Sequence, residues 1–234
     1  MIADRLADVR RRVARAALDA GRDPGHVRLL LATKTQPVHL VREALDADAR
    51  ARAEDPALTP VLVGENRVQE LVAKGPELAG LATVHLIGPL QSNKVNAALR
   101  WASCIESVAS LDLAERLSAR ATATLDVYVQ VNVSGEETKH GVEPDAAVAL
   151  AGEVAALPSL RVAGLMTVGA RSDDAAVVRS GYALLRSLRD EVVAAGTQTA
   201  TELSMGMSGD LELAVAEGAT LVRVGSAVFG ARPT

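Results

Sequence analysis

Short apolar runs alternate with longer segments of helical periodicity along almost the whole chain. The apolar runs, which predict buried strands, are Val27–Thr33, Val61–Gly64, Thr83–Ile87, Cys104–Ser107, Asp126–Val133, Val162–Val168, Ala200–Ser204 and Leu221–Gly225. The helical segments between them include Val38–Arg50, Leu111–Ala121, Pro144–Ala156, Ala175–Ala195 and Gly209–Glu217. Strands that alternate with helices are typical of parallel βαβ units, and eight such strands favour closure into a barrel. We therefore predict an α/β fold, a single-domain (β/α)8 TIM barrel over residues 1–234, with an open doubly wound sheet as the alternative.

Two segments lie outside this alternation. Apolar residues recur at helical spacing from Ile2 to Val13, which predicts an extra amphipathic helix that precedes the first strand and ends near Gly21. The segment Asp46–Pro60 is rich in alanine, arginine and acidic residues, and it reads as a long surface connection between a helix and a strand. No Pro/Ser-rich linker divides the chain, so we expect one domain.

Composition excludes several classes of function. The formal net charge is −4, so no overall basic field attracts nucleic acid or anionic lipid. One Trp, one Phe and two Tyr are too few for a base-stacking surface. No segment of about 18 residues is apolar and uncharged, and the amino terminus lacks the apolar core of a signal peptide. We therefore expect a cytoplasmic protein that binds neither nucleic acid nor membranes. Nothing in the sequence demands an oligomer, so we also expect a monomer.

Metal and disulfide chemistry are also excluded by residue type and spacing. The single cysteine, Cys104, cannot form an internal disulfide and is expected to be a small buried apolar residue. The four histidines are scattered without the spacing of metal ligands. We therefore expect no metal site.

Lys34 follows the first predicted strand directly, where its side chain would point into a pocket at the carboxyl end of the sheet. A lysine amine condenses with an aldehyde when a partly desolvated site lowers its pKa. A solvated loop lysine is the alternative interpretation of the position alone. The remaining motifs decide between the two.

Glycine and serine follow the last two predicted strands, the places where an α/β barrel often binds phosphate. One junction begins at Ser204 and Met205 and continues to Asp210, and the other contains Gly225 and Ser226. Such turns offer backbone N–H groups and hydroxyls to an anion. Arg223 stands between apolar neighbours in the last strand, where its charge requires a ligand or a structural ion pair.

Polar residues also follow the second and third strands. Asn66 lies in the cluster after the second strand, and His85 lies within the third, where a satisfied core histidine is the alternative to a functional one. In the fifth strand valines occupy one face, while Tyr128, Gln130 and Asn132 occupy the other. We expect the valines to pack on the helices and the polar face to point into the barrel.

Together these segments resemble the motifs of the pyridoxal phosphate homeostasis protein family, in the same order, from about residue 27 to Arg232. The motifs are Ala32–Thr35, Gly64–Glu70, His85–Lys94, Gly164–Met166, Leu203–Ser208 and Val222–Ser226. The resemblance implies a barrel like the amino-terminal domain of alanine racemase, with pyridoxal 5′-phosphate (PLP) bound at the strand ends. The sequence departs from the family at Val63 and Val84, where bulkier residues are common, and in the longer segment Asp46–Pro60.

The resemblance also implies a role for each site residue. Lys34 would form a Schiff base with the cofactor, Ser204 and the Gly225-Ser226 backbone would hold the phosphate, and Arg223 would face the pyridine nitrogen. The pocket would be lined by Asn66, His85 and Met205. A cationic arginine at that nitrogen disfavours its protonation and weakens the cofactor as an electron sink. Alanine racemase draws its opposing tyrosine base from a second domain, which we do not expect here.

The leading hypothesis is therefore a protein that binds, buffers or delivers PLP without an established reaction, with PLP-dependent apo-enzymes as candidate partners. A weak single-domain amino-acid racemase is the main alternative. Two further alternatives are a cofactor-free Schiff-base aldolase that uses Lys34 and an interaction protein whose basic first helix docks a partner.

Overall fold

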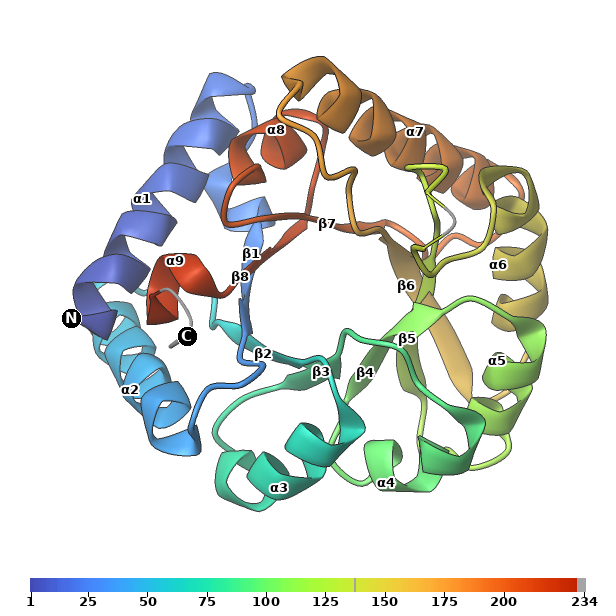
Figure 1. The fold of residues 1–234 in the computed structure, drawn as a ribbon, viewed down its shortest axis with the longest axis horizontal. Helices are drawn as coiled ribbons and strands as arrows, with labels where there is room; N and C mark the ends of the chain where they lie inside the picture. Colours follow the sequence, from blue (N-terminus) through green and yellow to red (C-terminus); the bar gives the residue numbers. More distant parts are fainter. Residues whose placement is uncertain (137, 231–234) are drawn as a thin grey trace.

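The computed structural model describes residues 1–136 and 138–230. Within them, eight parallel strands close into a barrel in which each strand pairs with the next and β8 pairs with β1 (Figure 1). The strands are β1 (Arg28–Ala32), β2 (Leu62–Glu65), β3 (Val84–Leu86), β4 (Cys104–Val108), β5 (Leu125–Gln130), β6 (Leu160–Met166), β7 (Glu202–Met207) and β8 (Leu221–Val224). The predicted TIM barrel is confirmed.

Helices surround the barrel on the outside (Figure 1). They are α1 (Ile2–Asp19), α2 (Val38–Glu54), α3 (Val68–Leu78), α4 (Val95–Leu99), α5 (Leu111–Ser118), α6 (Ala147–Ala155), α7 (Ala175–Ala194), α8 (Leu211–Ala216) and α9 (Ser226–Phe229), with 3₁₀ turns η1 (Pro24–His26), η2 (Ser92–Lys94) and η3 (Pro144–Ala146). In the part of the chain that the structure describes, no helix is both long and apolar enough to cross a bilayer.

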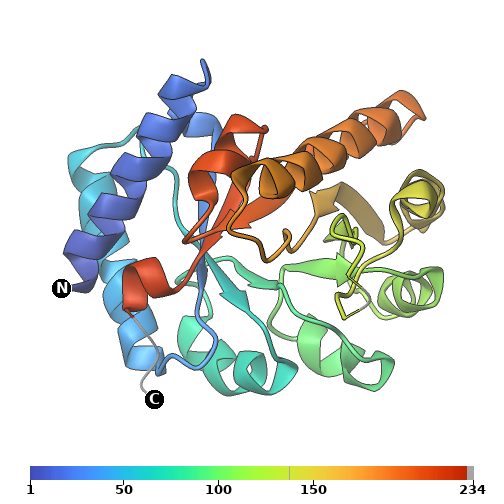
Figure 2. The same cartoon turned by 45° about the horizontal axis from the view of Figure 1, so that its top comes forward.

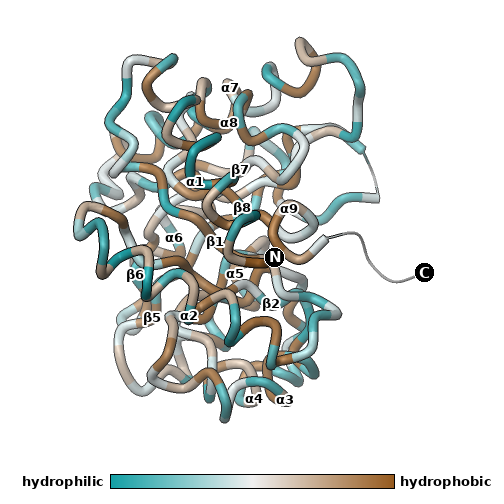
Figure 3. The backbone as a smooth tube through the Cα atoms, turned by 90° about the vertical axis from the view of Figure 1, so that its left-hand side faces the viewer, coloured by the Kyte–Doolittle hydropathy of each residue, from teal (hydrophilic) through white to brown (hydrophobic). Residues whose placement is uncertain are grey.

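The predicted extra helix, α1, precedes β1 and buries its apolar stripe. Ile2, Leu6, Val9 and Val13 belong to the main hydrophobic core. The helix lies along α2, α8 and α9 on the outside of the barrel (Figures 2 and 3). An amphipathic helix of this kind is stabilised by the apolar surface that it removes from water, at about 25 cal/mol per Å².

Alternation in β5 sorts its side chains as predicted. Val127 and Val129 join the core between the barrel and the helices. Tyr128 points the other way and packs inside the barrel with Cys104 and Met166. Cys104 is a buried free thiol, as expected. Here the interior of the barrel is filled by side chains, as is typical of this fold, in which ligands bind at the rim.

The predicted surface connection over Asp46–Pro60 is shorter than expected, because α2 continues to Glu54 and only residues 55–60 lie between this helix and the approach to β2. Its buried face includes Ala47 and also Asp48, whose carboxylate accepts hydrogen bonds from Arg10 and Arg52. Alanine, arginine and glutamate are good helix formers, so the composition suits a helix as well as a loop.

The predicted end of the seventh strand is wrong, because β7 runs to Met207 and not to Ser204. The glycine and serine of this segment suggested a turn, but Gly206 lies within the strand at φ 89°, where a Cβ would lie 2.4 Å from that of Ala214. Glycine is therefore required for close packing of β7 on α8. The extension moves the loop that follows β7 to Ser208.

Close contact between β6 and β7 makes Gly164 a sensitive position. A Cβ there would lie 2.0 Å from the carbonyl oxygen of Glu202, its partner on β7. We expect Gly164→Ala to lower the free energy of unfolding by about 2–3 kcal/mol, because the strands must separate. Gly152→Ala is the matched control, since nothing lies within 4 Å of its added Cβ. That change should stabilise α6 by about 0.5–1 kcal/mol, and denaturant unfolding measures both.

Candidate functional site

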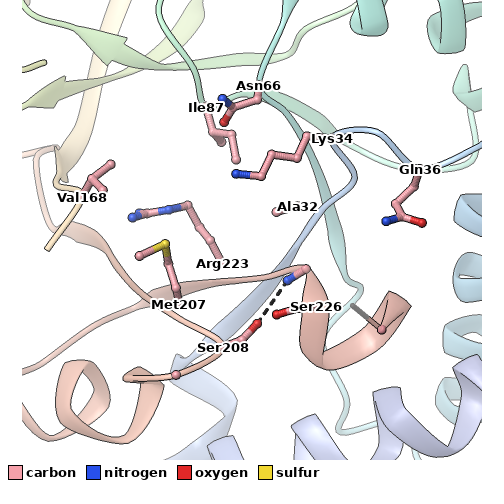
Figure 4. A pocket seen from close by; sticks show the side chains of 13 residues that line it. Ala32, Lys34, Gln36, Asn66, Ile87, Val168, Met207, Ser208, Arg223 and Ser226 are labelled. Carbon is pink, nitrogen blue, oxygen red and sulfur yellow. Dashed lines mark hydrogen bonds between the residues drawn. The ribbon is translucent and has the colours of Figure 1, made fainter. Parts of the chain in front are cut away.

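A cavity of about 480 Å³ opens at the carboxyl ends of the barrel strands. Its described lining comes from the loops after β1, β2, β3, β6, β7 and β8, which supply Lys34, Asn66, Ile87, Val168, Ser208 and Ser226 among others (Figure 4). The volume lies in the range of small-molecule sites, and the position is the one at which barrel enzymes bind their ligands.

The charge of the cavity is positive. Lys34, after β1, and Arg223, in β8, both extend their side chains into it (Figure 4). None of the described lining residues is acidic. Two cations without a carboxylate among these residues make the cavity a site for an anionic ligand.

The loops after β7 and β8 meet at one side of the cavity. The Ser208 Oγ accepts hydrogen bonds from the backbone N–H groups of Gly225 and Ala227, each at 3.3 Å (Figure 4 shows the first). Ser226 lies beside them and also lines the cavity. The two Gly/Ser junctions of the sequence are thus neighbours, and they collect hydroxyls and backbone amides at one point.

The loop after β7 is held from outside the cavity by Asp210. One carboxylate oxygen accepts the N–H of Met207 at 2.5 Å, and the other accepts the hydroxyl of Tyr182 at 2.8 Å. Burial, followed by the charge and the hydrogen bond of Asp210, raises the pKa of Tyr182. Tyr182 therefore stays protonated and acts as a hydrogen-bond donor that fixes the loop carrying Ser208.

Arg223 is held by a chain of buried hydrogen bonds on the side of its guanidinium that faces away from the cavity. Its Nη1 donates to the Ser204 Oγ at 2.7 Å, and its Nη2 donates to the Thr167 carbonyl oxygen at 2.6 Å. The Ser204 hydroxyl donates in turn to Glu106 at 2.6 Å, and the other oxygen of Glu106 lies 2.6 Å from the Nδ1 of His85. The guanidinium thus has an ionic network behind it and the cavity in front.

Glu106 is the anion of this network. Burial would raise the pKa of its carboxyl, but the hydrogen bond and charge of His85, the charge of Arg223 and the hydrogen bond of Ser204 together lower it. The ionised carboxylate only accepts hydrogen bonds, so the His85 Nδ1 donates. A buried carboxylate therefore lies opposite the arginine, as a buried charge requires.

The structure brings together some of the predicted site residues and separates others. Lys34, Asn66, Arg223, Gly225 and Ser226 line the cavity. His85, Ser204 and Met205 lie outside the described lining. Ser204 and His85 lie inside the barrel in the network behind Arg223, and Met205 packs in the core outside it.

Sequence reasoning missed Ser208, Met207 and Gln36 in the lining, and it missed Glu106 in the network. A signal for Glu106 was present, because a charged residue within the apolar run of β4 requires a partner in the same way as Arg223 does. Ser208 belongs to the motif Leu203–Ser208, in which the family resemblance implied Ser204 as the phosphate residue, whereas Ser208 is the serine that lines the cavity.

Comparison with known proteins gives one family. The family model of the alanine racemase N-terminal domain matches residues 25–233. The pyridoxal phosphate homeostasis protein of Pseudomonas aeruginosa is 43% identical over 235 residues, covering 99% of this chain and 96% of that protein. The protein of the same name from Escherichia coli K12 is 37% identical over 242 residues, covering 99% and 97%.

Solved structures agree with the sequence comparison. PipY of Synechococcus elongatus PCC7942, whose structure has PLP bound, superposes with a TM-score of 0.82 at 35% identity, covering 98% of this chain and 100% of PipY. Alanine racemase from Corynebacterium glutamicum superposes with a TM-score of 0.70 at 16% identity, covering 99% of this chain and 62% of the racemase. At that identity the second likeness concerns the fold alone.

Proposed function

This chain belongs to the pyridoxal phosphate homeostasis protein family, and on that premise we propose that it binds pyridoxal 5′-phosphate in the cavity at the barrel mouth. We propose that Lys34 attaches the cofactor covalently, as a Schiff base, and that the protein buffers PLP and delivers it to PLP-dependent apo-enzymes. The observation that carries the proposal is the meeting of a lysine amine, an arginine and the Gly/Ser loops in one positively charged cavity.

The donor set suits the three parts of the cofactor. The Lys34 amine provides a nucleophile for an aldehyde, and the hydroxyls of Ser208 and Ser226 with the backbone of Gly225 provide donors for a phosphate. Arg223 offers donors and no acceptor, so it would suit a ring nitrogen that carries no proton. When bound, PLP supplies an aldehyde and a conjugated ring that accepts electrons from a substrate.

Two features favour retention of the cofactor over turnover. Arg223 keeps the ring nitrogen unprotonated, which weakens electron withdrawal by the ring. Among the described lining residues, Lys34 is also the one candidate for a general base, because the others are apolar, amide, hydroxyl or arginine groups. Racemisation by the two-base route needs a second such group on the opposite face.

The residues behind the cavity take supporting roles in this proposal. Ser204 and His85 act through Arg223, which they hold with Glu106 at a fixed position. Ser208 replaces Ser204 as the hydroxyl for the phosphate, because it lines the cavity and Ser204 does not. Met205 contributes to packing between β7 and the helices.

A trapping experiment tests the proposal. The purified protein is incubated with PLP, desalted, reduced with borohydride and digested, and the peptides are weighed. We expect one cofactor mass on the peptide that contains Lys34 and none on the peptides that contain Lys94 or Lys139. Modification spread evenly over these lysines would contradict a specific site. Exchange of the α-proton of alanine with D₂O by the loaded protein would contradict the holding role and favour the racemase.

Ser208 should contribute to affinity for the phosphate. We expect Ser208→Ala to weaken PLP binding about tenfold, because it removes a hydroxyl and frees two backbone N–H groups that it now orders. Fluorescence or absorbance titration measures the change. Ser180→Ala is the control, since the Ser180 hydroxyl bonds the Val177 carbonyl oxygen on exposed α7. Pyridoxal, which lacks the phosphate, should bind both variants and the wild type equally.

A further inference from the structure

Thr35, the residue after Lys34, has an unusual backbone conformation. Among the described residues other than glycine, it alone has a positive φ, at 63°. A β-branched residue in this left-handed region is strained, because its Cβ crowds the neighbouring carbonyl oxygen. Such strain persists only where the surrounding structure imposes it.

Glu70 and Lys74 on α3 impose the conformation from both sides of Lys34. The Glu70 carboxylate accepts the Thr35 N–H at 2.6 Å. The Lys74 Nζ donates to the Thr33 carbonyl oxygen at 2.7 Å and lies 3.3 Å from Glu70. The peptide groups before and after Lys34 are therefore both fixed to one helix by charged side chains, whose hydrogen bonds are stronger than neutral ones.

Glu65, at the end of β2, anchors this arrangement to the barrel. Its Oε1 accepts hydrogen bonds from the Lys74 Nζ at 2.8 Å and from the Thr33 hydroxyl at 2.5 Å. The Glu65 side chain is fully buried, and that of Lys74 is 10% exposed. The charges are therefore screened little by water, and the contacts hold the turn in one geometry.

We propose that Glu70 is a positioning residue for Lys34: with Lys74 and Glu65 behind it, Glu70 holds Thr35 in the left-handed conformation and so directs the lysine amine into the cavity. This inference rests on the proposed function, because the amine has to meet a cofactor there. The pocket lining does not include Glu70, so its effect reaches the cofactor only through the turn.

Glycine at position 35 distinguishes positioning from general stabilisation. Glycine adopts a positive φ without a steric penalty, so it needs no carboxylate to hold it. Thr35→Gly should therefore restore cofactor capture in the Glu70→Ala background, although it adds no contact. A merely structural role for Glu70 predicts no such rescue, since the lost ion pair with Lys74 stays lost.

The experiment has one readout without cofactor and one with it. Amide exchange at Thr35, followed by NMR in the cofactor-free protein, reports the hydrogen bond to Glu70. The rate at which the lysine-bound absorption band appears after PLP is added reports the position of Lys34. Glu77→Ala is the matched control, because Glu77 lies on the same helix and its one ion pair among the described residues is with exposed Arg42 at 3.8 Å.

We expect Glu70→Ala to accelerate both Thr35 exchange and loss of cofactor about tenfold, and to slow capture by a similar factor. Glu70→Gln keeps a hydrogen-bond acceptor and should change each rate only a few-fold. If the alanine variant does not fold, the same rates can be measured in this variant instead. Thr35→Gly/Glu70→Ala should capture PLP within about twofold of Thr35→Gly alone. Glu77→Ala should match the wild type.

Besides a failure of Thr35→Gly to restore capture in the Glu70→Ala background, three outcomes overturn the inference. Unchanged Thr35 exchange in Glu70→Ala and Glu70→Gln would show that Glu70 does not hold the turn. Faster exchange with unchanged capture would show that the turn does not position Lys34. A wild type that captures no PLP would refute the proposed function and this use of Lys34 with it, and that failure differs from the first two because it occurs before any substitution.

Discussion

Lys34→Ala should abolish the visible absorption that the protein retains after incubation with PLP and desalting. The amine of Lys34 is the group in the cavity that can bond the cofactor aldehyde, so its loss leaves only reversible contacts with the phosphate and the ring. These contacts exchange during desalting. The fold should be unaffected, because the Lys34 side chain makes no hydrogen bond among the described residues. Spectra of the wild type and the variant, recorded side by side, measure the effect.

Lys94→Ala provides the control for that comparison. Lys94 ends the 3₁₀ turn η2 and does not line the cavity, so its removal should leave the retained absorption unchanged. If the absorption band survives in Lys34→Ala and disappears in Lys94→Ala, the cofactor is attached to Lys94 and not to Lys34. Loss in both variants would indicate that unfolding caused the change, which circular dichroism would reveal.

Glu106→Gln should lower the free energy of unfolding by about 3 kcal/mol at neutral pH. The substitution keeps the shape of the side chain but removes the buried negative charge that lies opposite Arg223 and His85. Arg223 cannot lose its proton, so its charge would remain inside the barrel without a compensating anion. Denaturant unfolding at several pH values measures the loss. Retained PLP should fall as well, because Arg223 would no longer be fixed.

The pH dependence of this effect has a definite sign. The folded pKa of Glu106 lies below its unfolded value, which is about 4.3 for glutamate. The carboxylate therefore contributes its stability above about pH 4.3, and the contribution is lost as the pH falls through the lower folded pKa. The wild type and Glu106→Gln should differ most near neutral pH and converge in acid.

Glu212→Gln tests whether burial of the ion pair is the reason for the large loss of unfolding free energy in Glu106→Gln. Glu212 also pairs with an arginine, Arg12 at 2.7 Å, but both side chains are more than one third exposed. Exposed pairs are screened by water, so this substitution should change the free energy of unfolding by less than about 1 kcal/mol. Equal losses in the two variants would contradict the assignment of Glu106 as the buried counter-charge.

The barrel could be predicted because each strand and helix is indicated by a pattern within its own short segment of the sequence. Each apolar run reports one buried strand, and each 3.6-residue pattern reports one helix, so alternation alone indicated the fold. Where one element carried mixed signals the prediction was wrong. The last turn of α2, which ends at Glu54, was assigned to a surface connection, and Gly206 suggested a turn where β7 continues to Met207.

Only those site residues could be predicted whose type is unusual for their position in the sequence. Lys34 and Arg223 stand out because charged residues border or interrupt apolar strands, and both line the cavity. The network behind Arg223 depends on contacts between distant strands, with Ser204 and Glu106 98 positions apart. No local pattern encodes such a pair. The strained turn at Thr35 was likewise invisible, since threonine gives no sign of a positive φ.

Pairing of β1 with β8 sets the order in which this protein can mature during synthesis. The strand that leads to Lys34 is made before the other seven strands, but one of its two neighbours is the last strand of the barrel. Until β8 arrives, β1 has an open edge, and neither Arg223 nor the loop at Gly225 exists beside Lys34. Contacts of such long sequence separation also slow folding. If the proposed function is right, a nascent chain would therefore capture the cofactor only after almost all of the described barrel has been made.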